Sequence, residues 1–320
     1  MRLLLVTIRG LEEAVKKESQ FRSLSPISTD LKSRVLVEGS LDDALRLRTV
    51  SAVCCLLGVA KLRGSGLRAL RLAIREALKG ASLPGETPVE VRAYVFGEGY
   101  TERIASAVAA REVKRVLKAE VKSHAPLTLQ IDVFCDRGEV YVSLRETKRG
   151  LDRRAYYIRK HPQSLNPIIA AALPWLAGMR ETDVLYDPMC GAGTIPIEAA
   201  LTLGCRALGS DSNRTYIAAA RDNARTAGVD LEFFVADAGS PPLSPSAVDL
   251  VACDPPRKPF RKALQALKLL VEQGYRKLAV VTPYLLQLTS YARSQGYSIE
   301  SLVRTFQGTE RIYIVLLHSR

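Results

Sequence analysis

The amino-acid sequence predicts an α/β protein in which two small α+β modules precede a parallel sheet with helices on both faces. The length of 320 residues exceeds what one hydrophobic core usually absorbs, so more than one domain is expected. Residues 1–159 mix strand-like and helix-like runs, whereas strand, loop and helix follow one another regularly after residue 161. Near-continuous apolar strands separated by helices are typical of a parallel sheet that is buried on both faces.

Alternating apolar residues and a high β-branched content predict the strands of the first half, which are Leu3–Ile8, Arg34–Glu38, Val89–Phe96, Leu127–Cys135 and Glu139–Arg145. Apolar residues at three- and four-residue spacing predict the helices, which are Leu11–Ser19, Leu41–Leu57, Leu67–Leu78 and Thr101–Lys118. The flexible tripeptide at residues 64–66, Gly-Ser-Gly, is expected to join the two modules.

The second half begins with a linker, expected over residues 160–180, that contains a helix. Apolar runs then predict the strands of the parallel sheet, which are Val184–Pro188, Ala207–Asp211, Leu231–Asp237, Val248–Asp254 and Leu278–Pro283. Helical segments separate the first four. The chain closes with Ser298–Phe306 and Arg311–His318, which are joined through Gln307-Gly308 and are expected to form a hairpin at the edge of the sheet.

The net charge of +13 is concentrated in the first half of the chain. Residues 1–160 contain 30 basic and 19 acidic side chains, against 16 and 14 in residues 161–320. The densest run, residues 145–160, predicts contacts to a polyanion such as RNA, although a solvated charged face is the alternative. The residues of this run expected to contact RNA are Lys148, Arg149, Arg153, Arg154, Arg159 and Lys160.

The cysteines and histidines do not predict a metal site. The six cysteines form no CxxC pair, and the three histidines stand apart from one another, which favours reduced thiols in a cytoplasmic protein. The longest uncharged run, residues 161–179, contains three prolines and is therefore a poor candidate for crossing a membrane. We expect no secretory signal, because no positively charged leader followed by an apolar run opens the sequence. The oligomeric state stays open, with a monomer favoured.

Acidic residues end the first four predicted strands of the second half, at Asp187, Asp211, Asp237 and Asp254. In an open α/β sheet, ligands bind beyond the carboxyl ends of the strands, so these four side chains are expected to line one cleft. Asp211 suits the hydroxyl groups of a ribose, and Asp237, beside Ala238, suits an exocyclic adenine amine. Considered alone, Asp211 could simply cap the helix that starts near Ser212.

A glycine-rich loop follows the first of these strands, in Asp187-Pro-Met-Cys190-Gly191-Ala-Gly193-Thr194. The two glycines allow a tight turn and a close approach of the backbone to a ligand, and Thr194 begins a helix whose free N–H groups face the same place. A dinucleotide-binding loop requires a third glycine where Pro196 stands, and Asp187 would repel a pyrophosphate. A ligand with a cationic or hydroxyl-rich part fits this loop better.

The order of Asp187, the loop 190–194, Asp211, Asp237 and Asp254-Pro255-Pro256 resembles the class I S-adenosylmethionine-dependent methyltransferases, in particular the amino-methylating branch with its (D/N)PP(Y/F) signature. Two upstream segments, residues 7–12 and 150–156, resemble the THUMP-containing RNA methyltransferases. Within that family, residues 187–200 are most similar to the tRNA guanine-N2 methyltransferases that act at position 6, with the position-10 enzymes next.

This resemblance implies a ferredoxin-like domain at residues 1–64, a THUMP domain at 65–159, a linker helix at 160–180 and a Rossmann-like methyltransferase domain at 181–320 with a seven-stranded mixed sheet. It implies tRNA as the partner and S-adenosylmethionine as the cofactor. The implied cofactor contacts are Asp187, Cys190, Gly191, Gly193, Thr194, Asp211, Ser212, Asp237, Ala238 and Asp254. Asp254 and the carbonyl of Pro255 would accept hydrogen bonds from the N2 amine of the target guanine, in the acceptor-stem region with position 6 favoured over 10.

One residue departs from the pattern of the family, because Arg257 stands where an aromatic residue stacks on the extruded base. Arg257 or Phe260 could provide a flat partner, and both are expected to contact RNA. Two alternatives remain. One is a non-catalytic tRNA-binding protein with the same fold. The other is an RNA 5-methyluridine methyltransferase, which shares the Asp-Pro-Pro-Arg sequence but requires a nucleophilic cysteine where this chain has Thr282.

Overall fold

The computed structural model describes residues 1–320 apart from 28–30, 86, 160–163 and 320. The chain divides into two compact units. The first consists of Met1–Val6, Ser19–Arg46 and Ala52–Gly150, and the second of Thr7–Glu18, Leu47–Ser51 and Leu151–Arg320. Helix α1 (Glu12–Phe21) therefore begins in the second unit and ends in the first.

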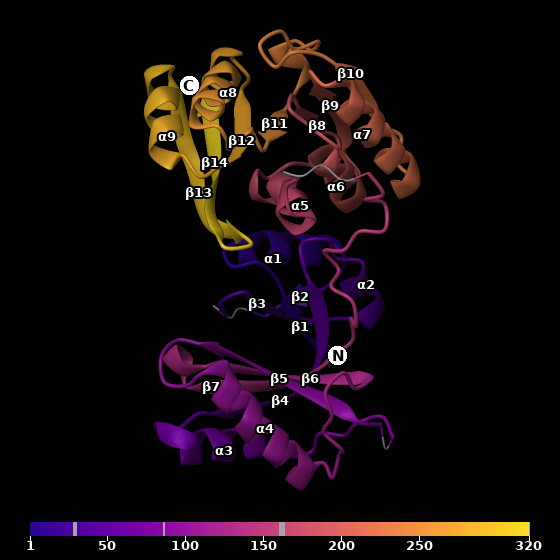
Figure 1. The fold of residues 1–320 in the computed structure, drawn as a ribbon, viewed down its shortest axis with the longest axis vertical. Coiled ribbons are helices and arrows are strands. Elements are labelled where there is room, and N and C mark those ends of the chain that lie inside the picture. The colour runs from indigo at the N-terminus through magenta and orange to yellow at the C-terminus, as the bar shows by residue number, and fades with distance from the viewer. Residues whose placement is uncertain (28–30, 86, 160–163, 320) are drawn as a thin grey trace. The chain divides into compact units, whose positions relative to one another are not determined.

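The first unit contains one seven-stranded sheet in the order β2-β3-β1-β4-β7-β6-β5 (Figure 1). Its neighbouring strands are antiparallel except for the parallel pair β5 and β6. Helices α3 (Gly66–Ala77) and α4 (Glu102–Val116) bury apolar residues against one face of the sheet. The strands are β1 (Arg2–Val6), β2 (Ser25–Pro26), β3 (Arg34–Glu38), β4 (Ala52–Lys61), β5 (Val89–Phe96), β6 (Leu127–Phe134) and β7 (Glu139–Arg145).

The predicted helix Leu41–Leu57 is wrong. A short helix, α2 (Leu41–Leu45), begins after Ser40, whose hydroxyl accepts from the N–H of Asp43, and strand β4 starts at Ala52. β4 hydrogen-bonds with β1 on one side and β7 on the other, and this pairing prevails over the helical spacing of its leucines. Because β4 joins strands from both sides of residue 64 in one sheet, the division into ferredoxin-like and THUMP domains stays a prediction.

The second unit contains the predicted seven-stranded mixed sheet, in the order β10-β9-β8-β11-β12-β14-β13. The first five strands in this order are parallel, and the hairpin of β13 and β14 joins β12 in antiparallel register, as predicted. The strands are β8 (Val184–Asp187), β9 (Arg206–Asp211), β10 (Glu232–Val235), β11 (Leu250–Cys253), β12 (Lys277–Thr282), β13 (Tyr297–Gln307) and β14 (Glu310–Ser319). The strand order reverses between β8 and β11, which is where open α/β sheets bind ligands.

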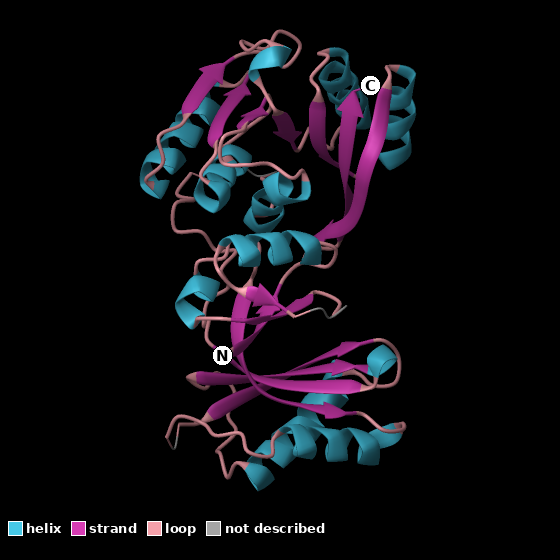
Figure 2. Ribbon diagram, turned by 180° about the vertical axis from the view of Figure 1, so that it is seen from behind, coloured by secondary structure: helices cyan, strands magenta, loops and turns pink. Residues whose placement is uncertain are grey.

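Helices cover both faces of this sheet (Figure 2). Successive residues of a strand point to opposite faces. Leu250 and Ala252 therefore pack in the core that contains α5 and α6, and Val251 and Cys253 pack in the core that contains α8 and α9. Helix α7 packs against β9 and β10. The helices are α5 (Pro167–Leu176), α6 (Thr194–Leu203), α7 (Arg214–Ala227), α8 (Phe260–Glu272) and α9 (Leu285–Ser294).

Helix α6 begins at Thr194, as predicted, and helix α5 begins after Asn166. Asn166 caps α5, because its side chain accepts from the N–H of Ile168. This helix lies within the predicted linker, but it is buried in the core of the second unit. Among the described residues, no helix has the length and hydropathy needed to cross a membrane.

Candidate active site

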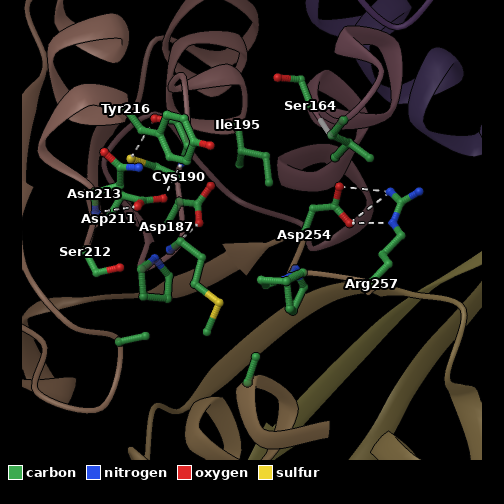
Figure 3. A pocket seen from close by; sticks show the side chains of 18 of the residues that line it. Ser164, Asp187, Cys190, Ile195, Asp211, Ser212, Asn213, Tyr216, Asp254 and Arg257 are labelled. Atoms are coloured by element: carbon green, nitrogen blue, oxygen red, sulfur yellow. Dashed lines mark hydrogen bonds and ion pairs between the residues drawn. The ribbon is translucent and has the colours of Figure 1, made fainter. Parts of the chain in front are cut away.

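A pocket of about 1070 Å³ lies at the carboxyl ends of the parallel strands of the second unit. All four strand-end carboxylates line it, namely those of Asp187, Asp211, Asp237 and Asp254. The pocket is also lined by Ser164, Cys190, Gly191, Thr194, Ser212, Ala238, Pro255 and Arg257. Figure 3 shows Asp187, Cys190 and Asp211 gathered in one part of the pocket, with Asp254 and Arg257 in another. The structure thus brings most of the predicted site residues together.

Asp187 is the most deeply buried acid of the pocket. Its Oδ1 accepts from the N–H of Met189 at 3.0 Å, which fixes the side chain at the end of β8. Burial raises the pKa of Asp187 well above its usual range, and the nearby carboxylates of Asp211 and Asp254 add to the effect. A ligand that places a positive charge here would relieve this unfavourable concentration of negative charge.

The glycine loop runs from β8 to α6 and is held from two sides. Gly191 and Gly193 both have positive φ, and a Cβ on Gly193 would lie 3.0 Å from the Cβ of Ala220. The side-chain amide of Asn223, buried on α7, donates to the carbonyl of Ala192 at 3.0 Å. No pattern in the sequence indicates Asn223, because only the folded chain brings α7 beside the loop.

Asp211 connects the loop to the next strand. Its Oδ2 accepts from the N–H of Gly191 at 3.0 Å, and its Oδ1 accepts from the N–H of Asn213 at 2.9 Å. The cap of α7 is Asn213, whose side chain accepts from the N–H of Thr215. The alternative that Asp211 caps this helix is therefore wrong. Asp237 is more exposed, and its Oδ1 accepts from the N–H of Gly239 at 2.7 Å.

Asp254 follows β11 and forms a close ion pair with Arg257. Nη2 of Arg257 donates to Oδ1 and Oδ2 of Asp254 at 3.0 and 2.9 Å, and Nε donates to Oδ1 at 3.2 Å. The side chain of Asp254 is 9% exposed and that of Arg257 is 14% exposed. Burial raises the pKa of Asp254 to about 6, while the positive charge of Arg257 acts in the opposite direction. The acid nevertheless ionises below neutral pH.

The two candidates for a stacking partner lie in different places. Arg257 lines the pocket, whereas Phe260, at the start of α8, makes an edge-to-face contact with Tyr284 at a centroid distance of 5.0 Å. The hydroxyl of Tyr284 donates to the carbonyl of Arg257 at 2.7 Å. The structure thus gives Phe260 an aromatic neighbour outside the pocket lining, while its proposed role with RNA stays a prediction.

The basic residues that were expected to contact RNA fall into two groups. Lys148, Arg149, Arg153 and Arg159 are exposed, and Arg159 forms a partly exposed ion pair with Asp222. Lys160 lies outside the described residues. The expectation for Arg154 requires correction, because its side chain is only 7% exposed and its guanidinium bonds internally to Glu198 and to the carbonyls of Leu151 and Arg48.

Arg154 belongs to a buried polar network on α6. Glu198 at its centre is fully buried and accepts from Arg48 at 2.7 and 2.8 Å, from Arg154 at 2.9 and 3.2 Å, and from the hydroxyl of Tyr156 at 2.7 Å. The network fastens residues 47–51 and 151–158 to the helix that carries the glycine loop at its start. Glu198 was missed because nothing in the sequence distinguishes a buried glutamate from an exposed one.

The nucleophilic cysteine required by a 5-methyluridine methyltransferase is missing from the end of β12. Thr282 ends β12, and its hydroxyl accepts from the N–H of Tyr284 at 3.0 Å. The nearest cysteine in sequence to the Asp-Pro-Pro-Arg segment is Cys253, which is buried in the core against α8 and α9. Burial raises the pKa of its thiol well above the usual range, which disfavours a nucleophilic thiolate.

Part of this chain is similar to known methyltransferases. Residues 154–281 match the family model of the RMKL-like methyltransferase domain. A tRNA (guanine(6)-N2)-methyltransferase of Methanocaldococcus jannaschii is 30% identical over 33% of this chain and 38% of its own length. A ribosomal RNA large subunit methyltransferase K/L of Magnetococcus marinus is 31% identical over 64% of this chain and 30% of its own length. The chain thus spans about a third of the length of these two curated relatives.

The fold also has a close counterpart among solved structures. The crystal structure of TrmN from Thermus thermophilus superimposes with a TM-score of 0.80 at 21% sequence identity, over 100% of this chain and 99% of that one. The similarity covers both units of the chain. At this identity the similarity shows a common fold.

Proposed function

We propose, on the premise that residues 154–281 carry an RMKL-like methyltransferase domain, that this protein transfers a methyl group to the exocyclic N2 of a guanine in tRNA. The observation that carries this proposal is the convergence of four strand-end carboxylates on one pocket, with Asp254 of the Asp-Pro-Pro segment among them. The M. jannaschii relative, whose name specifies guanine 6 of tRNA, supports this base and favours position 6 over position 10.

The residues of the pocket fit S-adenosylmethionine as the methyl donor. This compound supplies a methyl group on a positively charged sulfonium. Asp187 offers a buried carboxylate to a cationic part, and Asp211 and Asp237 offer acceptors to ribose hydroxyls and an adenine amine. The start of α6 and the Gly191–Gly193 turn let the backbone approach the ligand closely.

The volume of the pocket supports two ligands. Small-molecule pockets occupy roughly 300–1,000 Å³. The pocket of about 1070 Å³ lies at the upper end of this range, which is compatible with a methyl donor and an extruded base held together. Pro255 is buried beside Asp254, and as a proline it donates no backbone hydrogen bond. Its carbonyl and the carboxylate of Asp254 are the two acceptors that we assign to the target amine.

The chemistry assigned to Asp254 is orientation of the amine and acceptance of its proton. The lone pair of the guanine amine is delocalised into the ring, which makes it a poor nucleophile. Hydrogen bonds from its two N–H groups to Asp254 and to the carbonyl of Pro255 would direct this lone pair toward the methyl group. As the nitrogen gains a bond to carbon, it loses a proton, and the ionised carboxylate is the acceptor nearest to it.

The exposed basic residues supply the contacts to the phosphate backbone. Lys148, Arg149, Arg153 and Arg159 provide positive charge without a buried role, and Lys258 and Lys262 line the mouth of the pocket. Such contacts supply affinity but little sequence information, so binding should weaken steeply as salt increases.

The test is to incubate an unmodified tRNA transcript with the protein and isotopically labelled S-adenosylmethionine, and to analyse the nuclease digest by mass spectrometry. The proposal requires labelled N2-methylguanosine, and the digest maps its position. Label in another base, or donor binding in calorimetry without transfer, would contradict it. A ribosomal RNA fragment serves as the comparison substrate, because one of the relatives is named for ribosomal RNA.

A further inference from the structure

The guanidinium of Arg257 has partners on two sides. On one side it donates to both carboxylate oxygens of Asp254. On the other, Nη1 donates to Glu310 at 2.7 Å and Nη2 donates to Oε1 of Gln307 at 3.2 Å, both at the turn between β13 and β14. Since Tyr284 binds the carbonyl of Arg257, the backbone is fixed while the side chain has two places to bind.

The contact with Asp254 conflicts with the role proposed for that carboxylate. A base amine that donates to Asp254 must compete with the guanidinium for the same two oxygens. Only 9% of the Asp254 side chain is exposed, which leaves little room for both partners. Arg257 must therefore withdraw from Asp254, at least in part, before the base is seated.

We propose that Arg257 releases Asp254 when the target base enters the pocket and is transferred fully to Glu310 and Gln307, which it already contacts, so that Glu310 is a positioning residue of this site. This inference rests on the proposed function, because it assigns Asp254 to the base amine.

The donor geometry of arginine makes this transfer possible. A guanidinium has five N–H donors, and two of those in Arg257 already engage Gln307 and Glu310. After it withdraws from Asp254, the guanidinium therefore still has the carboxylate of Glu310 as a partner. Glu310 is 43% exposed, so the ion pair of Arg257 with Glu310 is weaker than the pair with Asp254. The amine of the base must therefore replace the hydrogen bonds that Asp254 loses.

Gln307 is itself held in place by the segment that precedes α5. Its Nε2 donates to the carbonyl of Ser164 at 3.1 Å, and its Oε1 also accepts from the N–H of Asn166 at 3.3 Å. The second position for Arg257 is therefore built on β13, β14 and the chain before α5. It exists before any ligand binds.

The transfer also changes the charge around Asp254. The groups that face it are Arg257, Glu310 of β14 and, more distantly, Asp187 of β8 and the thiol of Cys253. Once Arg257 withdraws, the pKa of Asp254 rises in the complex. The acid limb of kcat, which reports the complex, should then lie at higher pH than the acid limb of kcat/KM, which reports the free enzyme.

The test compares Glu310→Gln with Glu300→Gln. Glu300 is a matched control on the same hairpin, because its side chain is 47% exposed and it pairs with Lys277 away from the pocket lining. Without the charge of Glu310, Arg257 remains on Asp254, and the apparent KM for a tRNA transcript should rise about two- to fivefold, the factor that a half-exposed ion pair supplies. At saturating tRNA, the kcat of Glu310→Gln should match that of the wild type. Both kcat and KM of Glu300→Gln should stay at the wild-type values.

A second measurement does not depend on activity. In protein labelled with ¹⁵N-arginine, the Nε–H resonance of Arg257, assigned by its loss in Arg257→Lys, should move when the tRNA transcript is added, because this N–H bonds to Asp254 in the free protein. The shift should be smaller in Glu310→Gln. An unmoved resonance, or a Glu310→Gln variant with wild-type KM, would overturn the transfer. Wild-type protein that yields no N2-methylguanosine would refute the proposed function instead, and the resonance would still decide the transfer.

Discussion

Replacing Glu198 by alanine should destabilise the second unit more than any surface substitution. The carboxylate is fully buried and accepts five hydrogen bonds from Arg48, Arg154 and Tyr156. Its removal leaves two guanidinium groups near α6 without their anion. Breaking a buried ion pair in this way costs about 3–5 kcal/mol, so we expect the free energy of unfolding to fall by about that amount. Urea unfolding followed by circular dichroism measures the change.

The matched control is Glu232→Ala, which removes the exposed ion pair with Arg206 and should change stability by less than about 1 kcal/mol. Glu198→Gln should fall between the two, because it keeps the shape of the side chain but has one acceptor oxygen instead of two. If Glu198→Ala unfolds at the same urea concentration as Glu232→Ala, the network does not hold α6 as the structure indicates.

Four further predictions concern the pocket and its surroundings. The kcat/KM of methyl transfer should increase as the pH rises through about 6, where the raised pKa of Asp254 in the free protein places its ionisation, and a kcat/KM that is flat from pH 5 to 8 would contradict this. The same raised pKa means that the folded protein holds this proton more tightly than the unfolded chain. Ionisation of the buried carboxylate therefore lowers the free energy of unfolding by about 3 kcal/mol above about pH 6, and this loss is absent below pH 3.8. The variant Asp254→Asn should lack this part of the pH dependence of unfolding. Asp187→Asn should weaken binding of S-adenosylmethionine in calorimetry by about ten- to a hundredfold, the range for a hydrogen bond to a charged group, and unchanged affinity would remove Asp187 from the donor site. Arg153→Ala should weaken tRNA binding about two- to fivefold at unchanged stability, whereas Arg154→Ala should lower the free energy of unfolding by about 3–5 kcal/mol. Filter binding and urea unfolding measure the two effects. Variants that behaved alike in both measurements would contradict this prediction.

The sheet of the second unit could be predicted from the sequence because its strands are short apolar runs that end in acids. Periodicity failed at residues 52–57, where Val53, Leu56 and Leu57 suit a helix and a strand equally well. Their conformation is decided by pairing with β1 and β7, which are distant in sequence. Ser25–Pro26 is too short to leave a periodic signal, and it becomes a strand only by pairing with β3.

The candidate site likewise contains residues that the sequence could predict and residues that depend on contacts between distant parts of the chain. The carboxylates at the ends of β8, β9, β10 and β11 could be placed together because parallel strands present their carboxyl ends at one edge. Arg154 could not be separated from Arg153, because adjacent residues of a loop can face the core or the solvent. The partnership of Arg257 with Glu310 joins residues that are 53 positions apart, and no local pattern indicates it.

The most direct test of the account is the rate of a single turnover on tRNA by Asp254→Ala. The variant should bind S-adenosylmethionine and tRNA with nearly wild-type affinity, yet form N2-methylguanosine about a hundred- to a thousandfold more slowly, since the oriented acceptor of the amine is gone. A single-turnover rate close to that of the wild type, with both ligands bound, would show that Asp254 takes no part in the transfer.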